Sequence, residues 1–256
     1  MPSHPLRSYR SGVTSATTSR ASVIPGTTPR RIAATAGALY LVTFLSSIPA
    51  YLLITPILTQ PGYIVGSGAD TQVLFGSILD LVNALACIGT AVTLFPLIRR
   101  VHEPAALGFV AARVMEAAII VVGVMALFTV VSLRQPDATG TEAETLTLIG
   151  AALVTLRDWS FGFGPGFVPA INALLLGYVL YRSRLVPRII PIVGLIGAPL
   201  LASSTLGIML GVNHEGSVWQ GLATVPIFLW ELSVGLWMLI KGFDTDAVAA
   251  VTEEPR

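Results

Sequence analysis

Residues 105–133 read AALGFVAARVMEAAIIVVGVMALFTVVSL, an apolar run interrupted by only two charged residues, Arg113 and Glu116. At about 1.5 Å of rise per residue, a helix of this length crosses the roughly 30 Å hydrocarbon core of a bilayer. A charged side chain at the centre of a span costs roughly 2.5–3.5 kcal/mol when it faces lipid. The stretch therefore predicts a transmembrane helix whose two charges face the interior of the protein.

The composition extends this interpretation to the whole chain. Hydrophobic residues make up 54% of the 256 residues, charged residues make up 11%, and the mean hydropathy is +0.78. Soluble domains carry about 25% charged residues, so the fold class predicted is an all-α integral membrane bundle of six transmembrane helices. The predicted spans are Ile32–Leu58, Gln72–Ile98, Ala105–Leu133, Phe161–Tyr181, Ile189–Leu210 and Gln220–Ile240.

The lysine and arginine residues predict the orientation, because positive residues near span ends are retained in the cytoplasm. Twelve of them fall on the side of the two termini, against Arg134 and Arg157 on the other. We therefore expect both termini in the cytoplasm. The formal net charge of +1 gives no indication of nucleic-acid binding, and the lipid bilayer is the expected partner.

Three regions follow from this layout. Residues 1–29 contain eleven Ser or Thr and four Pro, which predicts a disordered cytoplasmic tail. Residues 30–243 form the six-helix transmembrane domain, and residues 244–256 form a short cytoplasmic tail.

The outer connection before the fourth span carries two helix signals. Thr141 and Glu144 have the spacing of a capping box, and Thr145–Leu156 places leucine and isoleucine on one face. This segment is too short to span, so we expect a short amphipathic helix at the outer interface. The alternative is a lid over a cavity.

The sequence FGFGPGF, residues 161–167, predicts a break in the helix that follows. Gly162, Gly164, Pro165 and Gly166 disfavour regular helix, and broken helices often line the substrate sites of transporters. The alternative is a plain kink or a close helix contact. In the fifth span, Ser203, Gly207 and Gly211 recur every four residues, which favours close helix packing within the bundle or between copies in a homo-oligomer.

Depth along the spans brings three charges into one layer. Arg113, Glu116 and Glu231 lie about 13, 18 and 15 Å from the cytoplasmic ends of their helices. Residues three apart share a helix face, and the planar guanidinium fork has enough donors for two carboxylates. We therefore expect a buried polar cluster of Arg113, Glu116 and Glu231.

Asp80 lies about 28 Å from the cytoplasmic end of its helix, and therefore toward the outer face. Asn83 shares its side of the helix. Together they predict an outer polar site near Arg134 or Arg157, or a pair that bonds only to itself and to the backbone.

The inner cluster leaves two functional hypotheses. One arginine against two carboxylates leaves an excess negative charge, which favours a small transporter or channel-like protein coupled to protons or cations. The alternative is a non-catalytic structural or regulatory protein whose buried charges only stabilise helix packing. The pattern identifies neither an ion nor a small molecule as the substrate.

Enzymatic chemistry has little support in the sequence. Cys87 is the only cysteine, and the three histidines fall in the tail and in loops. No nucleophile and base are expected to meet inside the membrane. We therefore expect no catalytic residues, no metal site and no cofactor.

Four stretches resemble a bacterial family of multi-spanning membrane proteins known as domain of unknown function 4386. They are RIAATAGALYLVTFL (31–45), AARVMEAAII (111–120), LLLGYVLYRSRLVPRIIPIVGLI (174–196) and WELSVGLWMLIKG (230–242). The resemblance covers nearly everything from Arg31 to Gly242 and implies a multi-pass protein of the bacterial plasma membrane, without a known activity.

Individual positions carry the resemblance as well. Those that match the family pattern are Arg113, Glu116, Glu231, Gly177, Tyr178, Ser183, Pro187 and Arg188. One departure is Asn172, where the family often has a histidine. If that histidine titrates in relatives, the difference weakens a proton-coupled role here.

Overall fold

The computed structural model describes residues 28–60 and 62–253, and within them it is helical without any β-strand. The predicted all-α fold is confirmed. All but the last two residues of the predicted disordered tail, residues 1–29, lie outside the described part. The helices are α1 (Pro29–Thr59), the 3-10 helix η1 (Tyr63–Val65), α2 (Asp70–Ile98), α3 (Glu103–Leu133), α4 (Gly140–Ser183), α5 (Ile189–Met209), α6 (Val218–Ile240) and α7 (Thr245–Glu253).

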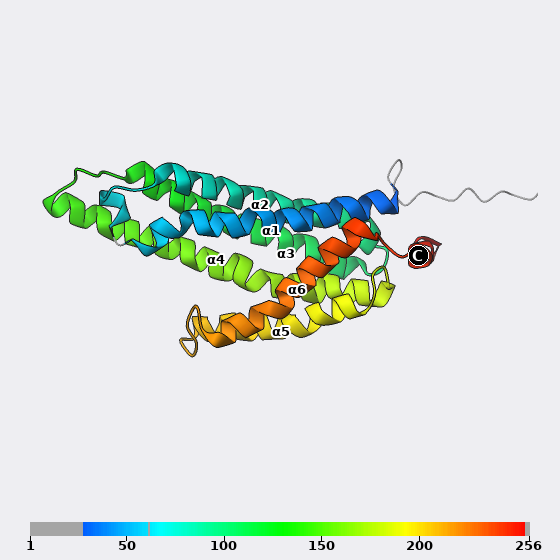
Figure 1. Ribbon diagram of the computed structural model, residues 1–256. Coiled ribbons are helices and arrows are strands. Elements are labelled where there is room, and N and C mark those ends of the chain that lie inside the picture. Colours follow the sequence, from blue (N-terminus) through cyan, green and yellow to red (C-terminus); the bar gives the residue numbers. More distant parts are fainter. Residues whose placement is uncertain (1–27, 61, 254–256) are drawn as a thin grey trace, which may run out of the picture.

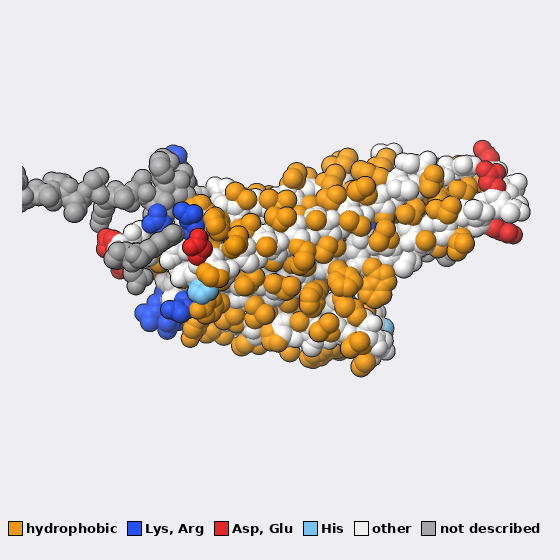
Figure 2. Space-filling view, turned by 180° about the vertical axis from the view of Figure 1, so that it is seen from behind, with side chains coloured by type: hydrophobic (Ala, Val, Ile, Leu, Met, Phe, Trp, Pro, Cys, Tyr) orange, Lys and Arg blue, Asp and Glu red, His pale blue; other side chains and the backbone are white. Residues whose placement is uncertain are grey.

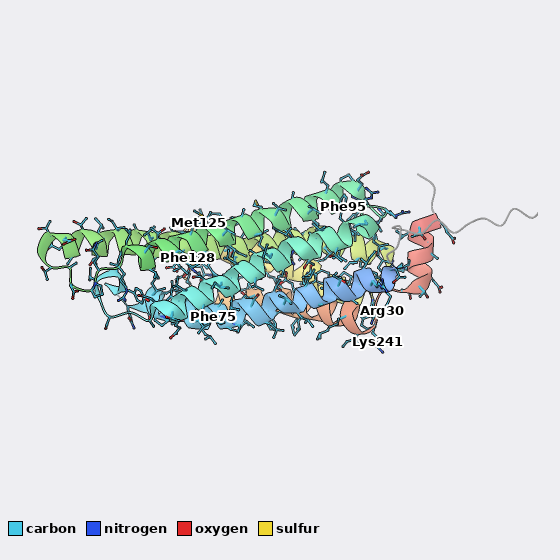
Figure 3. All side chains as sticks on the ribbon, turned by 90° about the horizontal axis from the view of Figure 1, so that it is seen from above. Arg30, Phe75, Phe95, Met125, Phe128 and Lys241 are labelled. Atoms are coloured by element: carbon cyan, nitrogen blue, oxygen red, sulfur yellow. The ribbon has the colours of Figure 1, made fainter. Side chains whose placement is uncertain are left out.

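Six of these helices, α1 to α6, are long and apolar enough to cross a membrane. Large apolar side chains such as Phe75 and Met125 point outward from them (Figure 3). Such exposure is unfavourable in water and favourable in lipid. The protein is a multi-pass membrane protein, as predicted.

The six long helices pack in chain order, and α6 closes the ring against α1. Figure 1 shows α1 and α6 close together near their shared end and diverging toward the other, while α3 and α4 extend past the α5–α6 pair. Side chains that point inward from five of the helices meet at mid-depth. This arrangement positions the charged cluster described below.

Short polar caps fix where three of the helices begin. Thr28 Oγ1 accepts from the Arg31 amide ahead of α1, and Ser217 Oγ accepts from the Gln220 amide ahead of α6. His102 Nδ1 accepts from the Ala105 amide at 3.1 Å ahead of α3. These caps satisfy amide donors that a helix start would otherwise leave unpaired.

The α1–α6 seam depends on two glycines. A Cβ atom added to Gly37 would lie 2.5 Å from the backbone nitrogen of Leu239, and one added to Gly235 would lie 2.9 Å from Tyr40 Cβ. The two backbones therefore touch here, in the manner of small-residue contacts between membrane helices. Arg30 strengthens the seam by donating to the Leu239 carbonyl at 2.8 Å, which caps the end of α6.

Helix α5 also uses glycines to approach α6, but not the predicted ones. The Trp230 ring packs onto Gly194, where an added Cβ would lie 2.6 Å from the ring, and Pro226 packs onto Gly197. The bulky side chains of α6 thus fill spaces that only glycine leaves open.

The predicted stripe of Ser203, Gly207 and Gly211 makes no such contact within the described chain. Ser203 is exposed, Gly207 faces its own turn at Asn213, and Gly211 has a φ of +71° with open space around it. Gly211 instead terminates α5 in the left-handed conformation that glycine adopts most readily. The prediction that these three residues pack within the bundle is therefore wrong. Their packing between copies of the protein stays a prediction.

The predicted break at Gly162, Gly164, Pro165 and Gly166 is also wrong, because α4 is one continuous helix from Gly140 to Ser183. A proline removes one backbone donor, and in lipid a regular helix satisfies the remaining backbone groups better than an open segment does. Helix α5 also contacts this stretch, because Thr205 Oγ1 donates to the Gly166 carbonyl at 2.7 Å.

The expected short helix Thr145–Leu156 is therefore the first part of α4, not a separate element. The helix starts at Gly140, ahead of Thr141, and its N-cap residue makes no side-chain hydrogen bond, so the expected capping box does not form. Leu146 and Gly150 instead pack onto the small apolar cluster around Ile64. This contact holds the outer part of α4 against the bundle.

The two ends of the molecule carry opposite charges. Exposed cations gather where α1, α3 and α5 begin and α2, α4 and α6 end, whereas exposed acidic residues mark the tip of the α3–α4 extension (Figure 2). The cations at the first end include Arg30, Arg31, Arg99, Arg100, Arg182, Arg184, Arg188 and Lys241, and the acids at the tip include Asp137, Glu142 and Glu144. We call the first end the cationic end and the second the acidic end.

An ion pair and a hydrogen bond meet on Asp70 at the acidic end, beside η1. Arg134 pairs with Asp70 at 2.6 Å, and Tyr63 donates its hydroxyl to the other oxygen of Asp70 at 3.0 Å. Burial, followed by this hydrogen bond, raises the pKa of Tyr63 to about 12. Arg134 is thus engaged with Asp70 and not with the predicted site around Asp80.

The predicted C-terminal tail, residues 244–256, contains a helix that the sequence analysis did not anticipate. Asp244 Oδ1 accepts from the Ala247 amide at 2.9 Å and starts α7. Val248 and Val251 of α7 pack against the main apolar cluster, which includes Phe243. The helix therefore rests on the cationic end of the bundle.

Candidate functional site

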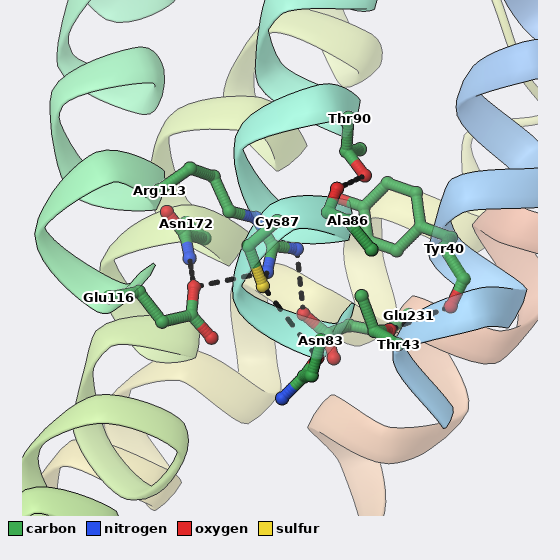
Figure 4. A network of polar contacts seen from close by, with 10 residues as sticks. All are labelled: Tyr40, Thr43, Asn83, Ala86, Cys87, Thr90, Arg113, Glu116, Asn172 and Glu231. Carbon is green, nitrogen blue, oxygen red and sulfur yellow. Dashed lines mark hydrogen bonds and ion pairs between the residues drawn. The ribbon is translucent and has the colours of Figure 1, made fainter. Parts of the chain in front are cut away.

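Arg113 of α3 lies at the centre of the bundle and is 2% exposed. Its Nη1 donates to Glu116 Oε2 at 3.0 Å and its Nη2 donates to Glu231 Oε1 at 3.0 Å (Figure 4). The first contact follows from the three-residue spacing on α3, and the second joins α3 to α6. The structure thus brings together the three residues that depth along the spans had grouped.

Aromatic rings and sulfur complete the surroundings of the guanidinium. Its carbon lies 5.1 Å from the Tyr40 ring centre and 5.8 Å from that of Phe109, and Nη1 lies 3.5 Å from Cys87 Sγ. Electron-rich ring faces and a polarisable sulfur stabilise a cation where water is excluded. The Nε atom has no hydrogen-bond partner among the described residues. Charge pairing and ring contacts therefore hold Arg113 in place.

Asn172 of α4 is a member of this cluster that the sequence analysis did not assign to it. Its Nδ2 donates to Glu116 Oε2 at 2.8 Å, so that this one oxygen accepts from both Asn172 and Arg113. Asn172 was noted only as a departure from a histidine. An amide holds the carboxylate with a donor that has no charge and does not titrate.

Each carboxylate of the cluster uses only one of its two oxygens. Within the described part of the chain, no hydrogen bond reaches Glu116 Oε1 or Glu231 Oε2. Glu116 is 4% exposed, whereas the Glu231 side chain is 15% exposed. One guanidinium therefore faces two carboxylates that still have free acceptor atoms.

A cavity of about 360 Å³ reaches these carboxylates. We call it the inner cavity. Its walls come from α1, α2, α3, α4 and α6, and besides the charged residues they are mainly apolar. The lining includes Phe44, Ile48, Leu52, Asn83, Arg113, Glu116, Pro165, Phe228 and Glu231.

A second hollow, of about 580 Å³, lies nearer the acidic end between α1, α4, α5 and α6. We call it the outer vestibule. Arg157, Asp158 and Glu215 give it a polar wall. Tyr51 and Phe161 line both the vestibule and the inner cavity, so these two rings form the partition between them.

The predicted outer polar site is divided in the structure. Asp80 lies 3.7 Å from Arg157, which is one of the two arginines that the sequence had proposed as its partner. Asn83 turns away from this pair, contacts Cys87 and lines the inner cavity. Arg157 also stacks over Phe161, at 4.7 Å from the ring centre. The Asp80–Arg157 pair therefore supports the partition, while Asn83 belongs to the inner cavity.

The residues of the predicted helix break border both hollows without interrupting α4. Pro165 lines the inner cavity, and Gly162 and Gly166 line the outer vestibule. Gly164 lies against Ile119 of α3. Three of these residues therefore line a cavity, although the backbone of α4 is not broken there.

No metal site is evident. Within residues 28–60 and 62–253, no three His, Cys, Asp or Glu side chains are gathered closely enough to hold an ion. The features left at the centre are a cavity, two carboxylates with free oxygens and one fixed cation. These features suit the binding of a positively charged group or a proton.

The family model described as "Domain of unknown function (DUF4386)" matches residues 35–242. The chain belongs to this family. The resemblance predicted from the four sequence stretches is confirmed. In this member of the family, the matched region contains all six long helices for most of their length and the whole Arg113–Glu116–Glu231 cluster. Comparison with curated proteins and with solved structures gave no match.

Proposed function

We propose that the protein transports a small solute across the membrane, with the inner cavity as the route by which the solute reaches Arg113, Glu116 and Glu231. The observation that carries this proposal is that the cavity ends on these buried charges while its opposite wall borders the outer vestibule. Ionisable side chains inside spans are costly, and they commonly mark a solute or ion pathway.

Dense packing on one side of the cluster supports a carrier over an open channel. Between the cluster and the cationic end, Leu94, Phe109 and Met238 are completely buried, and α1 touches α6 at Gly37. The hollows lie on the other side. A bundle that is open on one side of its binding site and closed on the other has the arrangement that alternating access requires.

The charge balance supports coupling to a proton or a cation. One guanidinium and two carboxylates leave an excess of one negative charge in a low-dielectric interior when all three are ionised. Such a charge is stabilised when a proton or a cation joins the site. Movement of that ion together with a solute would use the cluster in every transport cycle.

The charge asymmetry of the two ends supports an orientation. With the cationic end in the cytoplasm of a bacterium, as the positive-inside rule prescribes, both termini are cytoplasmic and the outer vestibule opens away from the cell. We infer a location in the bacterial plasma membrane, with the two hollows accessible from outside the cell. A reporter fused to the C-terminus that is active only in the cytoplasm tests the orientation.

A flux measurement tests the transport proposal. The purified protein is reconstituted into liposomes that enclose a pH-sensitive dye, and an inward proton gradient is imposed with valinomycin and potassium present to balance charge. We expect faster internal acidification than in protein-free liposomes. Glu231→Gln removes the cavity-facing charge and abolishes this flux, whereas Glu142→Gln, which changes an exposed carboxylate at the acidic end, leaves it intact.

The competing function is a structural or regulatory membrane protein whose charged cluster only holds the helices in register. The paired contacts of Arg113, at 3.0 Å to each of two carboxylates on different helices, favour this alternative. Proton flux equal to that of empty liposomes, in a preparation that remains folded, would support it and would reject transport.

A further inference from the structure

The inner cavity opens sideways, between α1 and α6. These helices touch at Gly37 and Gly235 and diverge away from the cationic end (Figure 1). The cavity rim lies along the diverging part, where Ile48, Leu52 and Phe228 are 51%, 65% and 41% exposed. Because this surface lies within the spans, lipid covers it. A molecule dissolved in the bilayer can therefore reach the cavity without crossing the outer vestibule.

The cavity combines an apolar wall with an acidic floor. Phe44 and Phe228 meet edge to face on the wall, with ring centres 5.1 Å apart. Glu116 and Glu231 form part of the floor, and each has one carboxylate oxygen that no described residue occupies. A ligand that satisfies both parts needs an apolar body and a positively charged donor group at one end.

We propose that the inner cavity binds a protonated amphiphilic amine that enters from the lipid between α1 and α6. Its ammonium group donates to the free oxygens of Glu116 and Glu231, and its apolar body lies along Phe44 and Phe228. The cavity volume of about 360 Å³ falls within the roughly 300–1,000 Å³ range of small-molecule sites. This inference names the solute class for the proposed transport route and rests on that proposal.

Charge and hydrogen bonding distinguish this ligand from others that lipid could deliver. A fatty acid would bring a third carboxylate next to two others, with only Arg113 to balance them. A neutral acyl chain would cover the acceptor oxygens without a donor, and buried acceptors without donors are unfavourable. The bound ammonium brings the net charge of the site to zero. It also supplies charge-assisted hydrogen bonds, and these are stronger than neutral ones.

The test measures binding by protection of a single reporter thiol. In a Cys87→Ser background, which removes the only cysteine, Ser47→Cys places a thiol on the cavity wall. The protein is held in lipid nanodiscs at pH 7, and methyl methanethiosulfonate labelling is followed by intact-protein mass spectrometry. The probes are decylamine, decanoate and decyltrimethylammonium, which share a chain length but differ in charge and in N–H donors.

We expect decylamine to slow labelling in a saturable manner and decanoate to have no effect. Decyltrimethylammonium protects at concentrations about tenfold higher, because it keeps the charge but lacks the donors. Glu231→Gln raises the decylamine concentration that gives half-maximal protection of the thiol by about tenfold, whereas Glu142→Gln leaves this concentration unchanged. If Glu231→Gln does not fold, Thr224→Trp serves instead, because it narrows the cavity at an exposed position and should also weaken protection.

The outcomes separate this inference from the transport proposal. Equal protection by decylamine and decanoate, or decylamine protection that persists in both Glu231→Gln and Thr224→Trp, would overturn amine binding. Proton flux that depends on Glu231 without decylamine protection would reject the solute class and keep transport. Saturable protection without flux would establish the amine site in a protein that does not transport.

Discussion

Tyr51 of α1 and Phe161 of α4 face each other with ring centres 5.9 Å apart, and this pair separates the outer vestibule from the inner cavity. Arg157 stacks on Phe161 at 4.7 Å and is itself 3.7 Å from Asp80. The partition is therefore supported from α2 through a charged pair, and the two rings are the lining residues that both hollows share.

Removal of one ring is expected to open the partition. Tyr51→Ala should increase the rate at which a membrane-impermeant cationic thiosulfonate labels a Ser47→Cys thiol from the acidic side, by about tenfold. The measurement uses proteoliposomes in the Cys87→Ser background. Leu148→Ala, which truncates an exposed apolar side chain in the outer part of α4, provides the control and should leave the rate unchanged. An unaltered rate in Tyr51→Ala would show that the rings do not limit access.

Loss of the central cation is expected to destabilise the bundle more than loss of the Glu231 carboxylate. Arg113→Ala leaves Glu116 and Glu231 without a neutralising partner, and breaking a buried pair costs about 3–5 kcal/mol. Glu231→Gln should cost only about 1–2 kcal/mol, because its side chain reaches the cavity and an amide oxygen can still accept from Arg113. Reversible unfolding in mixed detergent and SDS micelles gives both values. Similar losses in the two variants would contradict the central role of Arg113.

The α1–α6 seam should not accept even one methyl group at Gly37. Gly37→Ala places a Cβ atom 2.5 Å from the backbone nitrogen of Leu239, so the helices must separate, at a cost of about 1–3 kcal/mol. Gly162→Ala is the matched control, because nothing lies within 4 Å of its added Cβ and alanine favours helix by up to about 1 kcal/mol. Thermal unfolding in detergent compares the two. An unchanged melting temperature in Gly37→Ala would mean that the two helices do not touch there.

The Tyr63 hydroxyl should make stability depend on alkaline pH. Its pKa is raised from 10.0 to about 12, so between these values the folded protein retains a proton that the unfolded chain loses. Stability contributed by this group is complete below pH 10 and is lost as the pH rises toward 12. The melting temperature of the wild type should therefore fall more steeply over this interval than that of Tyr63→Phe. Parallel declines would show that Tyr63 does not titrate with a raised pKa.

The sequence was sufficient to predict the six long apolar helices and to group the three central charges, for a simple physical reason. Lipid excludes uncompensated charge, so Arg113, Glu116 and Glu231 had to face inward, and a constant rise per residue placed them in one layer. The same count finds Asn172, which lies eleven residues, or about 17 Å, before the end of α4 at Ser183. Its amide was not included because only ionisable residues had been placed by depth.

Local signals were less reliable where neighbouring helices decide the outcome. Pro165 and its flanking glycines indicate a break when α4 is considered alone, but two neighbouring helices pack against this stretch. Ile119 of α3 lies against Gly164, and Thr205 of α5 donates to the Gly166 carbonyl. Likewise, small residues occur in two registers on α5, and only the register of Gly194 faces the Trp230 ring. Which register packs depends on how the helix is rotated, and a sequence pattern cannot fix that rotation.

Helix α4 joins the acidic end of the protein to its centre as one element. From Gly140 to Asn172 the helix runs about 48 Å, past Pro165 and Pro169, and Asn172 donates a hydrogen bond to the carboxylate of Glu116. The exposed tip of α4 and the hydrogen bond that holds Glu116 therefore belong to one helix, so a tilt of the whole of α4 would displace both.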